Sequence, residues 1–419
     1  MRLNEMKTGT GTQIAGLLAL DIYCAYTILS GTAWTDILGR NVFGLMWKAM
    51  LGCLVLRVIL DDQHTIRQLF VWGLLFPLLI PVVRNAGSNR LFLQMSLVLL
   101  LYGIPFRRIV RSVFTSCLFW TLFVWLSCRA GILTNYEFNH GSKLKPVIAQ
   151  GMGFDYYSTF AFLILTMTAA WLYLRKEKCT AAELAALAVF HWLSYRHIHT
   201  TRLVVLTSEM YLVLFVIVVK LKWLTFRAPV WKKLAMLLPF LTFGGTWLLV
   251  WLYDHYRHLF DLMDKLFPTL SSRLSQSVEA YHMYGIRLFG SRLYLQGNRY
   301  VDYNTMKSGL YLDSNYVYML LAYGVVVSLI VIVLISLAYG YIYELQDPCL
   351  FLWFGTIIGI SMVNNFLLNA IYNVALLTVS QMLAEPGKKR RINEQKYSDQ
   401  QNRAVCGRGG RPSGRLFPE

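Results

Sequence analysis

Long apolar stretches separated by short polar segments occupy most of the chain between residues 11 and 385. Most of them are close to the roughly 20 residues that a helix needs to cross the hydrocarbon core of a bilayer. Their apolar residues are continuous and do not alternate with polar ones, which argues against a transmembrane β-barrel. We therefore expect an all-α polytopic membrane protein with about 12 transmembrane helices and a large outside loop that carries short helices. The expected spans are residues 11–30, 42–60, 67–83, 91–104, 110–133, 153–174, 180–195, 203–223, 234–253 and 315–338, with two more in residues 349–385.

The stretch 349–385 allows two interpretations, one kinked span or a tight hairpin of two spans. Each half is just long enough to cross a bilayer, and Asn364 and Asn365 in the middle favour a turn, so we expect the hairpin. Residues 1–385 then form one transmembrane domain. The polar, glycine-rich and basic residues 386–419 are expected to form a disordered cytoplasmic tail.

A long polar segment, residues 254–314, separates the ninth and tenth expected spans. Its first part, 254–267, has leucine and methionine at helical spacing, which predicts an amphipathic helix on the membrane surface that ends at Pro268. A second helix is expected from Ser272, as its N-cap, to Gly285. We place the whole segment outside the membrane as a large extracytoplasmic loop.

Composition and charge agree with a membrane protein. The 419 residues are 56% hydrophobic and the mean hydropathy is +0.46. A net charge of +18 would suggest a nucleic-acid partner for a soluble protein, but Lys and Arg also collect in the cytoplasmic loops of membrane proteins. With both termini cytoplasmic, the cations alternate between the two sides along most of the chain, so we expect no nucleic-acid partner. The seven cysteines form no CxxC pair, and we interpret them as packing residues.

The collection of Lys and Arg in cytoplasmic loops does not explain the positive charge of the large outside loop. Its arginines are Arg257, Arg273, Arg287, Arg292 and Arg299. A guanidinium group matches phosphate oxygens with two parallel hydrogen bonds and stays charged, so the cluster suggests an anionic ligand such as a lipid-linked diphosphate. Alternatively, some of these arginines pair with the acidic residues of the same loop. The tyrosines of the loop either stack on sugar rings or form an interfacial aromatic belt.

A second cationic group, Arg196 and Arg202, lies between the seventh and eighth expected spans. Arg202 begins the eighth span, where it either contacts a diphosphate or extends to the lipid headgroups. His197 and His199 lack the spacing of zinc ligands, and we expect no metal ion or other cofactor. Glu209 lies about two turns deeper than Arg202 on nearly the same face, where it lines the same cavity or forms an internal salt bridge.

Several short motifs follow one another from residue 200 to residue 324. They are Thr200-Thr201-Arg202-Leu203, Ser272-Arg273-Leu274, Ile286-Arg287-Leu288-Phe289-Gly290, Leu312-Asp313-Ser314-Asn315-Tyr316 and Ala322-Tyr323-Gly324. This series resembles the polysaccharide polymerases and ligases of the O-antigen polymerase (Wzy) type, and the span count and large outside loop agree. Residues 291–311 have no counterpart in the family pattern. Ligases often carry a histidine just before the position of Asn315; its absence here favours a polymerase.

The resemblance implies a reaction on the outer face of the bacterial cytoplasmic membrane. A growing glycan on undecaprenyl diphosphate is the donor, and a hydroxyl group of a new lipid-linked repeat unit is the acceptor. The lipid diphosphate leaves, and in a metal-independent site arginines must stabilise its negative charge. The partners are then the undecaprenyl-diphosphate-linked oligosaccharide and membrane lipid, and the protein acts alone or with a chain-length regulator.

Residue roles follow from this reaction and from the chemistry of the side chains. The residues expected in catalysis are Arg273, Arg202 and Arg292, with His282, Asp302 or Asp313 as the base. The residues expected to bind the substrate are Arg196, Arg287, Arg299, Asp302, Asn315 and Tyr316. The alternatives are an O-antigen-type ligase and a flippase or transporter for the lipid-linked oligosaccharide. Cations crowded in one outside loop, and not along a central cavity, argue against the flippase.

Overall fold

The computed structural model describes residues 9–61, 64–142, 145–198, 202–224, 226, 229–266, 268–295 and 310–385, most of them helical. The α-helices are α1 (Thr10–Leu29), α2 (Trp34–Leu60), α3 (Ile66–Ala86), α4 (Arg90–Leu100), α5 (Phe106–Arg129), α6 (Tyr157–Arg175), α7 (Ala181–Ile198), α8 (Arg202–Phe215), α9 (Pro229–His255), α10 (Asp261–Leu266), α11 (Pro268–Tyr284), α12 (Asn315–Glu344), α13 (Pro348–Ile360) and α14 (Thr378–Ala384). The shorter helical turns are η1 (Lys176–Lys178), η2 (Val216–Lys220), η3 (Arg257–Phe260) and η5 (Val374–Leu377), and the strands are β1 (Glu137–Ser142) and β2 (Lys145–Gln150).

Eight helices in the described part of the chain are long and apolar enough to cross a membrane. They are α1, α2, α3, α5, α6 with η1, α8 with η2, α9 and α12. Each coincides with an expected span, which confirms an all-α fold of the membrane-spanning kind. The other four expected spans correspond to α4, α7, α13 and the segment that ends in α14, and the total of 12 stays a prediction.

The C-terminal stretch differs from the expected hairpin of two helices. The helix α13 ends at Ile360, and the chain then runs irregularly to η5 and the seven-residue α14. Asparagine side chains replace the helical backbone bonds in this irregular segment. The side chain of Asn373 donates to the carbonyl oxygen of Leu367 at 2.7 Å, and that of Asn369 accepts from the amide of Ile371 at 3.0 Å. Such local bonds compete with helix formation, which explains why residues 361–373 form no regular helix.

A buried arginine holds the N-terminal helices together. Arg57 of α2 is 0% exposed, and its guanidinium group donates to the carbonyl oxygens of Leu100 at 2.7 Å, Thr12 at 2.5 Å and Tyr102. Two of these carbonyls lie at the C-terminal end of α4, where backbone acceptors lack helical partners. Gln381 of α14 donates to two further carbonyl oxygens of the same turn. Two polar side chains therefore supply hydrogen bonds to the carbonyl groups between α4 and α5.

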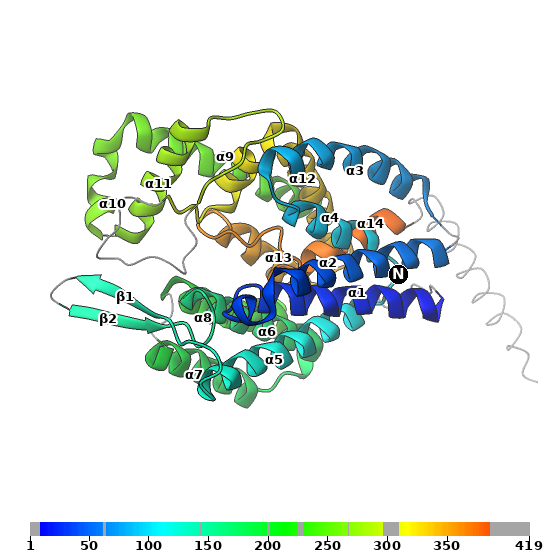
Figure 1. The fold of residues 1–419 in the computed structure, drawn as a ribbon, viewed down its shortest axis with the longest axis horizontal. Coiled ribbons are helices and arrows are strands. Elements are labelled where there is room, and N and C mark those ends of the chain that lie inside the picture. Colours follow the sequence, from blue (N-terminus) through cyan, green and yellow to red (C-terminus); the bar gives the residue numbers. More distant parts are fainter. Residues whose placement is uncertain are drawn as a thin grey trace, which may run out of the picture.

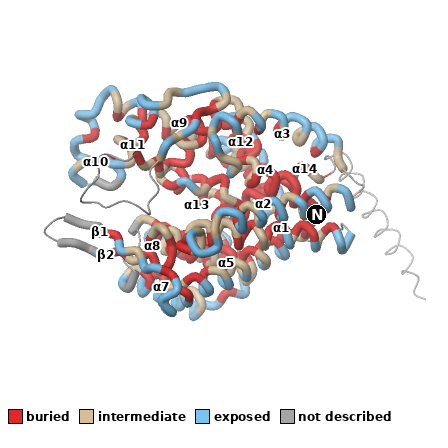
Figure 2. The backbone as a smooth tube through the Cα atoms, viewed as in Figure 1, coloured by how far each residue is buried: buried red, intermediate tan, exposed pale blue. Residues whose placement is uncertain are grey.

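The buried core lies where the helices α1, α6, α12, α13 and the segment before α14 meet, and the backbone of α3 is largely exposed (Figure 2). Tyr316, at the start of α12, is 0% exposed, and its hydroxyl group lies 2.9 Å from that of Thr242 on α9 and donates to the carbonyl oxygen of Ile358 on α13 at 2.8 Å. This residue therefore links three helices.

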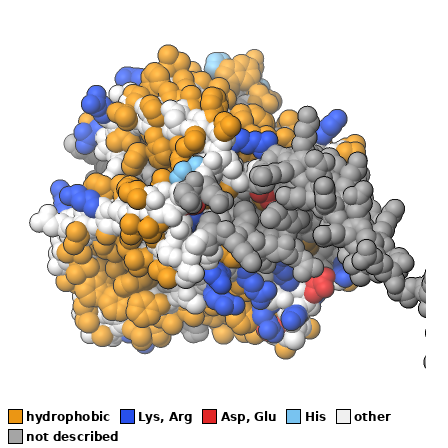
Figure 3. Space-filling model, turned by 90° about the vertical axis from the view of Figure 1, so that its right-hand side faces the viewer, with side chains coloured by type: hydrophobic (Ala, Val, Ile, Leu, Met, Phe, Trp, Pro, Cys, Tyr) orange, Lys and Arg blue, Asp and Glu red, His pale blue; other side chains and the backbone are white. Residues whose placement is uncertain are grey.

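Contacts between the connecting segments sort them into two sets. Segments expected inside pair with each other: Lys176 with Asp347 at 2.5 Å and Lys232 with Glu344 at 2.5 Å. The β-hairpin, α10 and α11 lie at the opposite end from the N-terminus and α14 (Figure 1). Figure 3 shows the end with the N-terminus, where Lys and Arg side chains lie in several groups. The sorting agrees with the expected topology, and which end faces the cytoplasm stays a prediction.

The polar segment after α9 has the expected helices with shifted boundaries. The first is divided into the end of α9, η3 and α10. The second helix, α11, begins at Pro268, so the prediction that Ser272 is its N-cap is wrong. Proline fits the first turn of a helix, where its missing amide donor has no helical partner, and the helix therefore starts one turn earlier. Gly285 ends α11 with φ +63°, as expected.

A β-hairpin is present where the sequence analysis expected only a polar connection. Strands β1 and β2 pair antiparallel, with Glu137 opposite Gln150. The tail expected over residues 386–419 lies outside the described residues.

Replacing Arg57 by methionine should destabilise the protein. The substitution leaves three buried carbonyl groups without a donor, and each such group costs about 1–3 kcal/mol. We expect a loss of about 3 kcal/mol or more in the free energy of unfolding, measured by thermal unfolding of the purified protein. The control is Arg67→Met on the exposed start of α3, with an expected change within about 0.5 kcal/mol. Equal melting temperatures for the two variants would contradict this role of Arg57.

Candidate functional site

The start of α12 carries the central ion pair of the candidate site. Ser314 caps the helix by accepting from the amide of Val317. The preceding residue, Asp313, binds Arg273 of α11, with 2.9 Å between Asp313 Oδ2 and Arg273 Nε. The Arg273 side chain is only 13% exposed, whereas that of Asp313 is 36% exposed. The structure thus brings together two residues that the sequence analysis assigned to catalysis.

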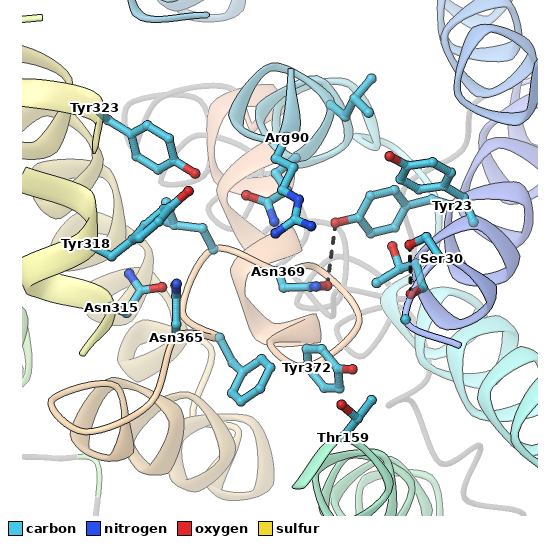
Figure 4. A pocket seen from close by; sticks show the side chains of 17 residues that line it. Tyr23, Ser30, Arg90, Thr159, Asn315, Tyr318, Tyr323, Asn365, Asn369 and Tyr372 are labelled. Atoms are coloured by element: carbon cyan, nitrogen blue, oxygen red, sulfur yellow. Dashed lines mark hydrogen bonds between the residues drawn. The ribbon is translucent and has the colours of Figure 1, made fainter. Parts of the chain in front are cut away.

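A polar cavity of about 220 Å³ reaches the start of α12, where Asn315 is part of its wall (Figure 4). Its walls come from α1, α4, the start of α6, the start of α12 and the irregular segment after α13. Asn315, two residues after Asp313, is one of the lining residues, as expected for a substrate-binding residue. Tyr316 faces away into the core described above, so its position differs from the expected one and gives it a packing role.

The helix α12 is interrupted at Gly324, which has φ +82°. The segment Arg287–Ser291 fills the interruption through main-chain hydrogen bonds. Val325 and Val326 of α12 donate to the carbonyl oxygens of Arg287 and Leu288 at 3.1 and 3.3 Å, and Ser291 donates to Leu321 at 2.9 Å. The loop therefore forms hydrogen bonds with backbone groups of α12 that the interruption would otherwise leave unpaired.

Two glycines make this close approach sterically feasible. A Cβ atom on Gly290, which has φ +71°, would lie 2.0 Å from the carbonyl oxygen of Ala322. A Cβ atom on Gly324 would lie 2.3 Å from the amide nitrogen of Gly290. Both glycines belong to motifs on which the family resemblance rests, and the fold places those two motifs in direct contact.

The same loop carries two of the expected arginines. Arg287 and Arg292 line a surface hollow of about 520 Å³ together with Asn85 at the end of α3. The Asn85 side chain donates to the carbonyl oxygen of Phe289 at 3.2 Å, and Arg292 lies 5.2 Å from the ring of Tyr294. Arg292 also lies against Gly87. The short connection from α3 to α4 therefore borders this hollow and leads into the polar cavity.

His282 is separated from the Arg273–Asp313 pair. Its Nε2 atom lies 2.9 and 3.0 Å from the two carboxylate oxygens of Asp254, and its side chain is 60% exposed. Arg273 and His282 are nine positions apart on α11, which is about 14 Å along the helix axis at about 1.5 Å per residue. Of the two base candidates in the described part of the chain, Asp313 is therefore the one that pairs with Arg273 and lies two residues from the cavity-lining Asn315.

The remaining site predictions fall elsewhere. Arg196 on α7 stacks over Trp192 of the same helix at 5.8 Å. Arg202 is the first residue of α8, which supports its expected place at the start of a span. Glu209 of α8 lies 3.2 Å from Nδ1 of the buried His191, which favours the internal-pair interpretation of this carboxylate. Arg299 and Asp302 lie outside the described residues.

The sequence analysis did not find most residues of the cavity wall. Arg90, Gln94, Asn365 and Asn369 were given no binding role. A usable signal was present, because asparagines in a stretch as apolar as 349–385 are costly in a membrane unless they have a partner.

Comparisons with known proteins add no family assignment. No protein-family model and no curated protein matches the sequence, and no solved structure matches the fold.

The arrangement combines three chemical capacities. Guanidinium groups of Arg273, Arg287 and Arg292 can bind oxyanions at one end of the helices. The carboxylate of Asp313 can accept a proton from a hydroxyl group. Hydroxyl and amide groups of the cavity can form hydrogen bonds with a polar, uncharged molecule.

Replacing Gly290 by alanine should separate the loop from α12. The new methyl group overlaps the carbonyl of Ala322 and also meets an unfavourable φ, which together cost about 3 kcal/mol or more. Gly285→Ala is a matched control, because Gly285 also has positive φ but has nothing within 4 Å of the added Cβ. We expect Gly290→Ala, but not Gly285→Ala, to expose Arg287 and Arg292 to rapid trypsin cleavage. Equal cleavage rates would contradict the importance of the close approach.

Proposed function

We propose that this protein is a polysaccharide polymerase that joins lipid-diphosphate-linked repeat units on the outer face of the bacterial cytoplasmic membrane, in the biosynthesis of exopolysaccharide, capsule or O-antigen. The observation that carries the proposal is the Arg273–Asp313 pair, which immediately precedes the start of α12, where Asn315 lines a polar cavity. It combines an anion-binding group, a proton acceptor and a hydroxyl-binding surface at one end of the membrane helices.

The proposed reaction is a glycosyl transfer between two lipid-linked molecules. A hydroxyl oxygen of the acceptor repeat unit attacks the anomeric carbon of the growing glycan, a new glycosidic bond forms, and the bond to the lipid diphosphate breaks. Asp313 takes the hydroxyl proton. The leaving diphosphate gains negative charge in the transition state, and positioned cations stabilise that charge.

The arginines divide these tasks according to their positions. Arg273 is largely buried and fixed by Asp313, so it is preorganised to meet charge that develops near the cavity. Arg287 and Arg292 lie at the adjoining hollow, where they bind the outer phosphate groups. Arg196 and Arg202 provide a second anion-binding region at the α7–α8 connection.

A further feature suits a lipid-linked substrate. An apolar groove of about 560 Å³ lies between α7 and α8, lined by residues that include Trp192, Val205 and Leu206. Trp192 and Leu206 are 57% and 66% exposed, so this face is open toward the membrane. An isoprenoid chain in the groove would leave its diphosphate near the Arg196 end of α7.

Substituting Arg273 by alanine should abolish chain extension while the protein stays in the membrane. The test restores the variant gene to a deletion strain and compares glycan length on a gel with the amount of protein in the membrane fraction. We expect at least about a hundredfold less long glycan, as for the loss of one transition-state donor.

The control for this experiment is Arg257→Ala. Arg257 belongs to the same outside loop, but its side chain is 66% exposed and lies 3.9 Å from Asp264, away from the cavity. Normal glycan length with Arg257→Ala is expected. Glycan of normal length with Arg273→Ala would contradict the assigned site.

The second substitution, Asp313→Asn, tests the proton acceptor. The amide keeps the size of the side chain and can still accept a hydrogen bond, but it cannot take a proton. We expect chain extension to fall by about a hundredfold or more, in the range of a lost general base. The matched change His282→Gln should leave more than half of the wild-type activity, and the reverse order of effects would assign the base to His282.

A further inference from the structure

Within the described part of the chain, the polar cavity has one charged side chain in its wall. Seventeen residues line it, and among them only Arg90, the first residue of α4, carries a charge. Its guanidinium group points into the space between Tyr318 and Tyr323 of α12 on one side and Tyr23 of α1 on the other (Figure 4). Among the described residues no carboxylate forms a salt bridge with Arg90, and the cavity wall contains none. The cavity therefore offers one unneutralised positive charge.

The other lining side chains suit a sugar ring. Six are aromatic, and these rings can cover the apolar face of a pyranose. Four others are amides, namely Gln94, Asn315, Asn365 and Asn369, and an amide both donates and accepts hydrogen bonds. Sugar hydroxyl groups need both kinds of partner.

One of the amides has an unused donor. Asn315 is 2% exposed, and within the described part of the chain its Nδ2 atom has no hydrogen-bond partner. An unpaired buried donor costs about 1–3 kcal/mol, which a ligand oxygen that accepts from Asn315 would recover. The site thus has both a charge and a donor available for a ligand.

The size of the cavity limits the ligand. A volume of 220 Å³ corresponds to about seven water molecules at about 30 Å³ each, below the roughly 300–1,000 Å³ of sites for drug-sized molecules. One sugar ring fits this space.

The charge of the cavity selects among acidic groups. A phosphate monoester carries about −1.5 to −2 charge at pH 7, more than one guanidinium neutralises. A carboxylate carries one charge, and its two oxygens match the fork of one guanidinium group.

We propose that the cavity binds one pyranose ring that carries a single carboxylate, with Arg90 on the carboxylate and Asn315 on a ring oxygen or hydroxyl group. The inference rests on the proposed function in that this ring is assigned to the acceptor repeat unit. Arg90 is then the residue that determines specificity for an acidic acceptor sugar.

The test is a binding titration, followed by ligand-observed NMR, with the full-length protein in lipid nanodiscs. The probes are the methyl glycosides of glucuronate, galacturonate and mannuronate, their three neutral counterparts, and inorganic phosphate. We expect at least one uronide to bind the wild type at least about tenfold more tightly than its neutral counterpart. Arg90→Gln should remove this preference, and Arg90→Lys should retain only part of it, because lysine keeps the charge but not the fork.

The control variant is Arg84→Gln, an exposed arginine near the end of α3 that does not line the cavity. It should retain the full preference. The proposal is overturned if none of the uronides binds the wild type, or if the preference survives in a folded Arg90→Gln variant. Displacement of the uronide by an equal concentration of phosphate would also overturn it, since the site would then bind anions in general.

The failure of this inference is distinguishable from that of the proposed function. Uronide binding that depends on Arg90, in a protein whose deletion leaves glycan length unchanged, would support the cavity assignment and contradict the polymerase. Loss of chain extension in Arg273→Ala without any uronide binding would support the polymerase and overturn the cavity assignment.

Discussion

The main-chain bonding between the Arg287–Ser291 loop and the interruption in α12 is the interaction on which the site depends. Inside a membrane no water replaces a lost backbone hydrogen bond, so a break in a spanning helix must be satisfied by other protein groups. Here the Arg287–Ser291 loop supplies them, and two glycines allow the backbones to meet. The part of α12 before the break carries Asn315, Tyr318 and Tyr323, which line the cavity, so the loop is joined to the cavity wall through this helix.

The same constraint recurs at the other irregular segments. Arg57 and Gln381 satisfy the carbonyl groups between α4 and α5, and Asn369 and Asn373 satisfy those after α13. The cavity is lined by the second of these segments and by the interrupted helix, because only non-helical backbone frees space and polar groups between packed helices. Some of the polar side chains buried among the helices thus form hydrogen bonds with unpaired backbone groups, and others line the cavity.

The sequence predicted the long helices well and the site only in part. The start of α12 at Asn315 was predictable, because a capping serine precedes a long apolar run. The contact of Arg273 with Asp313 was indicated only indirectly, because the two residues belong to two motifs of the family pattern that the sequence resembles. The cavity was not predictable, because its wall joins residues such as Tyr23 and Asn369, which are hydrogen-bonded at 3.4 Å across 346 positions. The roles of Tyr316 and Arg57 depend on partners 42 to 74 positions away, which no local pattern encodes.

The central claim is that this protein lengthens a lipid-linked glycan outside the membrane. The most direct measurement is the size of the lipid-linked and surface glycan in a strain without the gene, with and without its restoration. The account predicts single repeat units that reach the outer face and no long chains, with long chains recovered on restoration. Full-length chains left on their lipid, or repeat units retained on the cytoplasmic side, would contradict it.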